Sequence, residues 1–329
     1  MKQSAAVRPE PTLQRKAAIA AGGVKDHAGS VQVEPIENFD LNQTIFQTLE
    51  GTAARYVMKT RVGKDVHWST DTAAVVQDRY RAARASCELP EVSTDLLRFM
   101  VEECDFDVEH ADGSFLDHLY FGFEYTVQHY PQQSPLVMLL HSILGTGTNT
   151  FAMDADKIPA LRALLAPQDW IHIEAFPSVL RLLYAGDLRT ELRENHHRLD
   201  ALEAIHFHRV IDNAPITMSG ADLWVQLNYQ LIHLIDFLPV ANWSAHRNDT
   251  SFIVFRDLYA FMSEAGMLSA KLDYVPASGP RQLEGERQSL GGWLTTLIPV
   301  GLSESMAASS VRRFSDRIGH SMAYQIDWR

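Results

Sequence analysis

Two histidines in the middle of the chain, His118 and His141, have a type and spacing suited to metal binding or proton transfer. Imidazole is the commonest metal ligand in proteins, and it titrates near neutral pH. His118 lies in an apolar run that begins at Phe115, and His141 ends the next apolar run. A short turn at 130–135 joins the two runs, so an antiparallel pair of helices would bring both rings together. We therefore predict a buried reaction centre that contains both histidines.

The residues around these histidines resemble the first half of the HD-domain superfamily. The two segments are Gly113-Ser-Phe-Leu-Asp-His-Leu119 and Leu139-Leu-His-Ser-Ile-Leu-Gly-Thr146. In that superfamily a histidine on one helix, a His-Asp pair ending the next helix and a distant aspartate bind one or two metal ions. The resemblance is closest to a poorly characterised bacterial branch that has His-Ser in place of His-Asp. It implies a helical bundle and, from better-known relatives, either phosphate-ester hydrolysis or iron-dependent oxygenation.

Position 142 departs from the full motif, because serine stands where the motif has aspartate. A carboxylate can bridge two cations, whereas a neutral hydroxyl is a poor ligand. We therefore expect one divalent metal ion, with iron favoured, since two histidines and one carboxylate suit non-haem Fe(II). Asp187, Asp222 and Asp236 are the alternatives for the carboxylate. Asp236 is favoured because it lies one turn past His233 on a long predicted helix.

Five other histidines lie in segments with differing local patterns. His110 precedes the helix that carries the first histidine and is a further catalytic candidate. His196 and His197 lie among charged residues, which predicts a solvated face. His206 and His208 alternate along a short segment, and they are interpreted as structural.

Three functions remain open from the residues alone. The first is a metal-dependent oxygenase or hydrolase that acts on a small, partly apolar molecule, with His118 and His141 as ligands. The second is a metal-free enzyme on the same scaffold, in which one of the two histidines carries the proton. The third is a ligand-binding protein without catalysis, because a fold does not by itself give a function.

The composition excludes several other classes. The chain has 329 residues and a formal net charge of −12, which argues against binding to nucleic acid. It has no apolar run long enough to span a membrane and no export signal, so we expect a cytoplasmic protein. Its two cysteines cannot form a disulfide framework. The oligomeric state stays open, with a homodimer as one alternative.

The positioning elements are predicted to be helices, forming an all-α, HD-like bundle at 40–275. A disordered or extended tail precedes it at 1–39, and a linker with a docking segment follows at 276–329. Short alternating stretches at 31–36 and 205–210 do not support a sheet. Helices are predicted from apolar spacing and caps at 41–59, 94–100, 115–130, 135–145, 157–165, 170–184, 188–205, 221–238 and 252–265.

Overall fold

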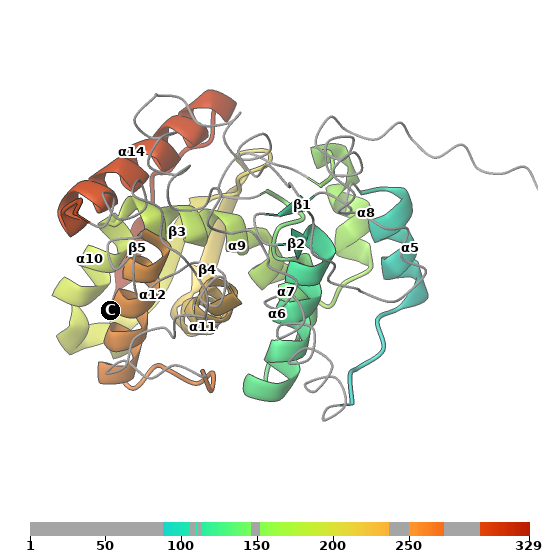
Figure 1. Cartoon of the computed structure of the whole chain (residues 1–329), viewed down its shortest axis with the longest axis horizontal. Helices are drawn as coiled ribbons and strands as arrows, with labels where there is room; N and C mark the ends of the chain where they lie inside the picture. Colours follow the sequence, from blue (N-terminus) through green and yellow to red (C-terminus); the bar gives the residue numbers. More distant parts are fainter. Residues whose placement is uncertain (1–87, 105–108, 111–112, 146–151, 237–249, 273–296) are drawn as a thin grey trace, which may run out of the picture.

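The structure is a computed structural model that describes residues 88–104, 109–110, 113–145, 152–236, 250–272 and 297–329 (Figure 1). The predicted tail at 1–39, the predicted helix at 41–59 and the alternating stretch at 31–36 lie outside these residues. The described residues are mostly helical, as the apolar spacing predicts, with small sheets in addition.

The first part of the described chain is helical apart from a very short hairpin. The predicted cap of its first helix is confirmed, because the Ser93 side chain accepts a hydrogen bond from the Leu96 backbone N–H at 3.2 Å. The chain reverses between the helices that end at His129 and begin at Leu136. The elements are α5 (Thr94–Glu102), β1 (Glu109–His110), β2 (Gly113–Ser114), α6 (Phe115–His129), α7 (Leu136–Leu140), η2 (Ala155–Lys157), α8 (Ile158–Ala163) and α9 (Pro167–Ala185).

The second part mixes helices with a sheet. Ser219 caps its long helix as predicted, because the Ser219 hydroxyl accepts a hydrogen bond from the Asp222 backbone N–H at 3.1 Å. The helix before Gly266 also ends as predicted, with this glycine at a φ of 70°. The elements are α10 (Asp187–Glu194), η3 (His196–Ala201), β3 (Leu202–His208), β4 (Pro215–Ser219), α11 (Gly220–Asp236), α12 (Thr250–Glu264), α14 (Val300–Ile318) and β5 (Gln325–Trp328).

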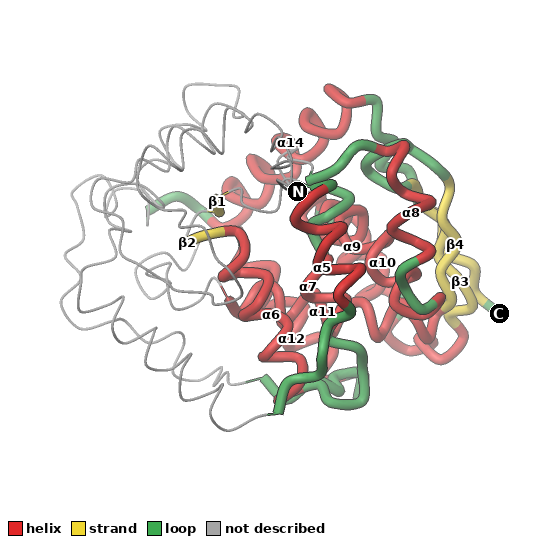
Figure 2. Tube along the Cα trace, turned by 90° about the vertical axis from the view of Figure 1, so that its right-hand side faces the viewer, coloured by secondary structure: helices red, strands yellow, loops and turns green. Residues whose placement is uncertain are grey.

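The sheet corrects two sequence predictions. The predicted helix at 188–205 ends at Glu194, and the last part of that stretch belongs to β3. The stretch at 205–210 was predicted not to support a sheet, and this was wrong, because its first four residues complete β3. Antiparallel strands are arranged in the order β4-β3-β5, with Ile205 paired to Met218 on one side and to Ile326 on the other. One partner strand, β4, follows β3 closely, but the other, β5, lies at the far end of the chain and gives no local signal, so tertiary pairing overrode the predicted helix. Figure 2 shows β3 and β4 at one side of the helices, next to the C-terminus.

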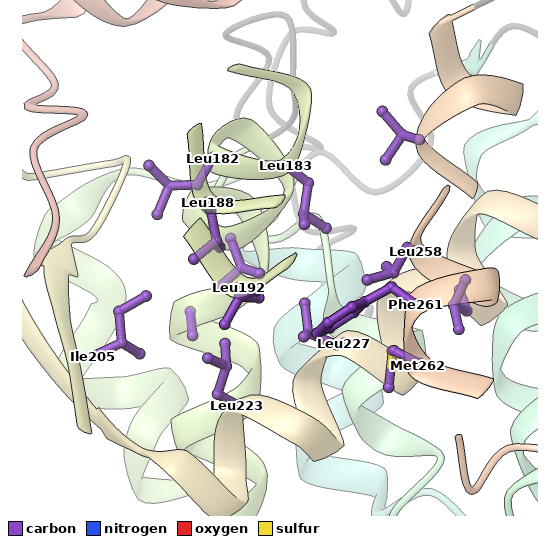
Figure 3. Close-up of a cluster of buried hydrophobic side chains, with 14 of the residues drawn as sticks. Leu182, Leu183, Leu188, Leu192, Ile205, Leu223, Leu227, Leu258, Phe261 and Met262 are labelled. Atoms are coloured by element: carbon purple, nitrogen blue, oxygen red, sulfur yellow. The ribbon is translucent and has the colours of Figure 1, made fainter. Parts of the chain in front are cut away.

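A hydrophobic core joins this sheet to the helices around it. Leucines from α9, α10, α11 and α12 form one buried cluster that also contains Ile205 of the sheet, as Figure 3 shows. Burial of each such side chain contributes about 1.5–3 kcal/mol. The central members of the core, all at most 2% exposed, are Val179, Leu183, Leu188, Leu192, Ile205, Leu223, Leu227, Leu231, Val254, Phe255, Leu258 and Met262.

Helix α9 lies at the centre and is almost wholly buried. It packs against α7, α11, α12 and α14, and α6 packs against both α7 and α11. A second core of buried side chains fills the space among α5, α6, α7, α9 and α11. Four helices therefore converge where the sequence predicts the reaction centre, namely α6, α7, α9 and α11.

Candidate functional site

Helices α9 and α11 are linked by a regular ladder of polar contacts. Each rung joins two residues that are 54 positions apart in the chain, and successive rungs are one helical turn apart. The two helices therefore run parallel and in register. The rungs are Gln168 Nε2 to Asp222 Oδ1 at 2.7 Å, His172 Nδ1 to Gln226 Oε1 at 3.1 Å, and Gln230 Nε2 to the Phe176 carbonyl at 3.0 Å.

A pair of histidines lies at the inner end of this ladder. His141, directly after α7, and His233, on α11, have ring centroids 4.7 Å apart with ring planes at 69°. Phe176 of α9 contacts both rings, at 4.8 Å from His141 and 5.4 Å from His233. The side chains are buried, at 1% exposure for His141 and 7% for His233. We call His141 and His233 the histidine pair.

The orientation of the His141 ring is fixed by a backbone group. His141 Nδ1 lies 2.7 Å from the Met138 carbonyl oxygen. A carbonyl oxygen only accepts hydrogen bonds, so Nδ1 carries the hydrogen and the lone pair of the neutral ring is at Nε2. Histidines that bind metals or move protons through one ring nitrogen are commonly oriented by a hydrogen bond from the other ring nitrogen.

A third buried imidazole, His172, lies two rungs along the ladder from the pair. Burial lowers the pKa of His172, while the hydrogen bond with Gln226 and the carboxylates of Asp222 and Asp169 oppose this shift. His172 Nε2 is 4.0 Å from Asp222 Oδ1. The lowered pKa favours the neutral imidazole, which can accept a proton, at neutral pH.

The structure brings only some of the predicted site residues to this place. His141 is in the pair, and Asp222 lies beside His172 at the outer end of the ladder. His118 belongs to α6 and Asp236 ends α11, but the side chains of both lie outside the described part. The same holds for the side chain of His110, in β1.

Asp187 is the predicted ligand that the structure places elsewhere. It begins α10, and its carboxylate lies 2.6 Å from Arg312 in an exposed ion pair with α14. Phe176 and Asp187 are separated by half of α9, roughly 15 Å of helix. As an alternative for the carboxylate beside His141, Asp187 is therefore not supported. Asp187 was an alternative because it begins a predicted helix after Gly186. The position of a helix N-terminus in the sequence does not tell which residues it lies next to in the fold.

Two other pairs of histidines have structural surroundings. His196 and His197 are exposed, as predicted, although they lie in η3 rather than in a charged helix. His206 bridges the sheet, with Nδ1 2.9 Å from Thr217 Oγ1 and Nε2 2.7 Å from Asp327 Oδ2. The His208 carbonyl accepts hydrogen bonds from Ser178 and His320.

The residues that sequence reasoning missed are His172, Gln226, Gln230 and His233 as members of one site. A signal was present, because polar residues recur at four-residue spacing inside two otherwise apolar helices. These polar side chains, at 168 and 172 on one helix and at 222, 226 and 230 on the other, follow the same helical period. The sequence did not reveal that the two helices run parallel in register, which is what aligns the two stripes.

The donor set supplies part of a metal site. Two imidazoles meet in the histidine pair, and Ser142 next to it is buried. Among the side chains that the structure describes, no group of three His, Cys, Asp or Glu is arranged to hold a metal ion. The predicted ligands His118 and Asp236 belong to α6 and α11, and their side chains are outside this described set.

Comparison with known proteins leaves the function open. No family model matches the chain, and no curated protein or solved structure is similar to it. No helix in the described residues is long and apolar enough to cross a membrane.

Proposed function

We propose that the protein is a metal-dependent enzyme that acts on a small molecule, an oxygenase or a hydrolase, with its reaction centre at the histidine pair. The observation that carries this proposal is the contact between the buried rings of His141 and His233, in which the Met138 carbonyl orients one ring. Two imidazoles at this separation are compatible with a shared ion, because metal–nitrogen bonds to histidine are about 2.0–2.1 Å long.

The packing of α6 on α7 supports a role for His118. A Cβ atom on Gly122 would lie 2.7 Å from Met138 Cε and 3.2 Å from Met138 Cβ, so the two helices approach closely there. The chain reverses between the two helices, so residues that precede Gly122 lie beside residues that follow Met138. Position 118 is one turn before Gly122, and position 141 is about one turn after Met138. Position 118 is therefore expected at the level of His141, as the resemblance to HD-domain proteins implies.

On this proposal, His141 and His233 hold one divalent ion, with iron favoured and with His118 and Asp236 as the candidates for the remaining ligands. The bound ion would supply either activation of O₂ or a lowered pKa for a water molecule. The Met138 carbonyl keeps the lone pair of His141 at Nε2, and the Phe176 ring packs against both imidazoles.

The test is elemental analysis of the full-length protein purified without chelator, followed by titration of the metal-free protein with Fe(II) and with Co(II). The expected result is one ion per chain and, with Co(II), ligand-field bands of a site with nitrogen ligands. Stoichiometry well below one ion after titration, or bands that survive removal of both members of the histidine pair, would overturn the proposal.

A second candidate is a metal-free acid/base enzyme, which two observations favour. Ser142 stands where the HD motif has a ligating aspartate, and the buried His172 has a lowered pKa. On this alternative a histidine of the site takes up the proton, and His172 has Gln226 and Asp222 to orient it. Turnover of an identified substrate that is unchanged after exhaustive chelation would select this candidate over the first one.

A further inference from the structure

Helix α11 buries three side-chain amides, and one of them is fully hydrogen-bonded. Asn228 donates to the carbonyls of Trp224 and Met267, and its Oδ1 accepts from the backbone N–H groups of Ser269 and Ala270. All four hydrogen-bonding positions of this amide are thereby used. Asn228 is a structural residue that ties α11 to the turn after α12.

The other two amides, Gln226 and Gln230, use only one atom each. Gln226 Oε1 faces His172 Nδ1, and Gln230 Nε2 donates to the Phe176 carbonyl. Gln226 Nε2 and Gln230 Oε1 have no hydrogen-bond partner among the residues that the structure describes. Both side chains are 0% exposed. An unsatisfied buried polar group costs about 1–3 kcal/mol, so two in succession call for an explanation.

The two unpartnered atoms belong to side chains that reach from α11 to α9. Each belongs to an amide whose other atom already contacts α9, and the two atoms of an amide share one carbon. Gln226 and Gln230 are one turn apart, which puts their Cβ atoms about 5–6 Å from each other. A donor and an acceptor on neighbouring turns of one helix can both contact the same small group.

We propose that Gln226 and Gln230 bind a neutral group that offers both an acceptor and a donor, such as a carboxamide or a ureide of the substrate. Gln226 Nε2 donates to its carbonyl oxygen, and Gln230 Oε1 accepts from its N–H. A carboxylate would place negative charge against Gln230 Oε1, and an ammonium group would leave Gln226 Nε2 without an acceptor. One free donor and one free acceptor therefore favour a neutral ligand group that has both an acceptor and a donor.

The location connects this site to the reaction centre. Gln230 precedes His233 by one turn of α11, and it bonds to the same Phe176 whose ring contacts the histidine pair. Recognition of a substrate at the two glutamines therefore rests on the proposed function, whereas binding of an amide at this place does not require a metal ion.

The experiment uses the full-length, metal-free protein and acetamide as the probe. Acetone serves as a probe of similar size that accepts but does not donate. Amide resonances of α9 and α11 are followed by NMR during titration at millimolar probe concentration, and crystals are soaked with each probe. The expected result is saturable shifts and an ordered acetamide between the two glutamines, with clearly weaker shifts from acetone.

Two variants, Gln226→Met and Gln230→Met, keep the side-chain length and remove the amide. Each is expected to weaken acetamide binding at least tenfold without loss of folding, whereas Gln325→Met on the exposed end of β5 leaves it unchanged. The result that overturns the inference is an ordered water between the glutamines that acetamide does not displace, or shifts that persist in both variants. Because binding is read without metal or turnover, failure of the proposed function would leave this result unaffected.

Discussion

His141 and His233 meet edge to face in the protein interior, with ring centroids 4.7 Å apart, although one follows α7 and the other lies near the end of α11. Two protonated imidazoles this close would repel each other strongly in a buried place. The arrangement is therefore compatible with two neutral rings that share one cation, as the proposed function requires.

Replacement of either histidine of the pair by alanine is expected to weaken metal binding. His141→Ala and His233→Ala each remove one proposed nitrogen ligand. The Kd for Co(II) should therefore rise by more than about tenfold, because tenfold is the smallest effect typical of losing a group that only orients a ligand. Isothermal titration measures this change. His197→Ala, at an exposed position, is the matched control and should leave the Kd unchanged. Equal affinity in all three variants would contradict the prediction.

Stability is expected to fall in mild acid because of His320. Burial is the main cause that lowers the pKa of His320 to about 4; the positive charge of Arg181 and the electrostatic interaction with His208 act in the same direction, and the hydrogen bond to the His208 carbonyl opposes them. The unfolded chain then binds a proton that the native state does not. The stability is complete above a pH of about 6.5 and is lost as the pH falls towards about 4, by at most about 3 kcal/mol.

Urea unfolding of wild type and His320→Gln between these pH values checks this prediction. Glutamine can keep a hydrogen bond to Ser315 or to the His208 carbonyl, the two partners of the native ring, but it does not titrate. The variant should therefore show a shallower pH dependence, while His197→Gln retains that of the wild type. The buried His172, whose pKa is also lowered, contributes in the same direction in all three proteins.

Gly220, at the start of α11, is expected to tolerate no side chain. A Cβ atom there would lie 2.1 Å from the Leu202 carbonyl oxygen, which belongs to β3 and cannot move away alone. Gly220→Ala should destabilise the protein by about 1–3 kcal/mol. Gly301→Ala in α14 is the control, because nothing lies within 4 Å of its added Cβ, and a gain of up to about 1 kcal/mol is expected. Thermal unfolding of both variants compares them directly.

Asn228 is expected to be a strong determinant of stability. In Asn228→Asp the side chain keeps its shape, but it can no longer donate to the carbonyls of Trp224 and Met267 and would place buried charge against them. The expected loss is about 3–5 kcal/mol at neutral pH, with partial recovery at low pH, where the carboxyl group is protonated. Chemical unfolding at two pH values tests this, and an exposed change, Gln325→Glu, should have little effect.

Part of the architecture could be predicted from local pattern. The caps at Ser93 and Ser219 and the helix end before Gly266 are set by residues within one turn, so the sequence alone indicates them. The central helices are apolar on most faces, and their length and caps identify them without knowledge of their neighbours. The buried position of His141 follows from the same local signal.

Contacts between distant segments could not be predicted in this way. Residues 202–205 were predicted to end a helix, but they belong to a strand that pairs with β4 and with β5 from the far end of the chain. The carboxylate alternatives were open for the same reason, since Asp187 proved to pair with Arg312 of α14.

The sequence by itself determined the helical elements, their caps and the buried environment of His141, because these depend on side-chain period and on neighbours in the chain. Only the tertiary structure decided that His233 is the partner of His141 and that Gln226 and Gln230 face α9. The physical reason is the parallel register of α9 and α11. Many registers of two apolar helices would bury a similar area, so the sequences of the two helices alone do not select the observed one.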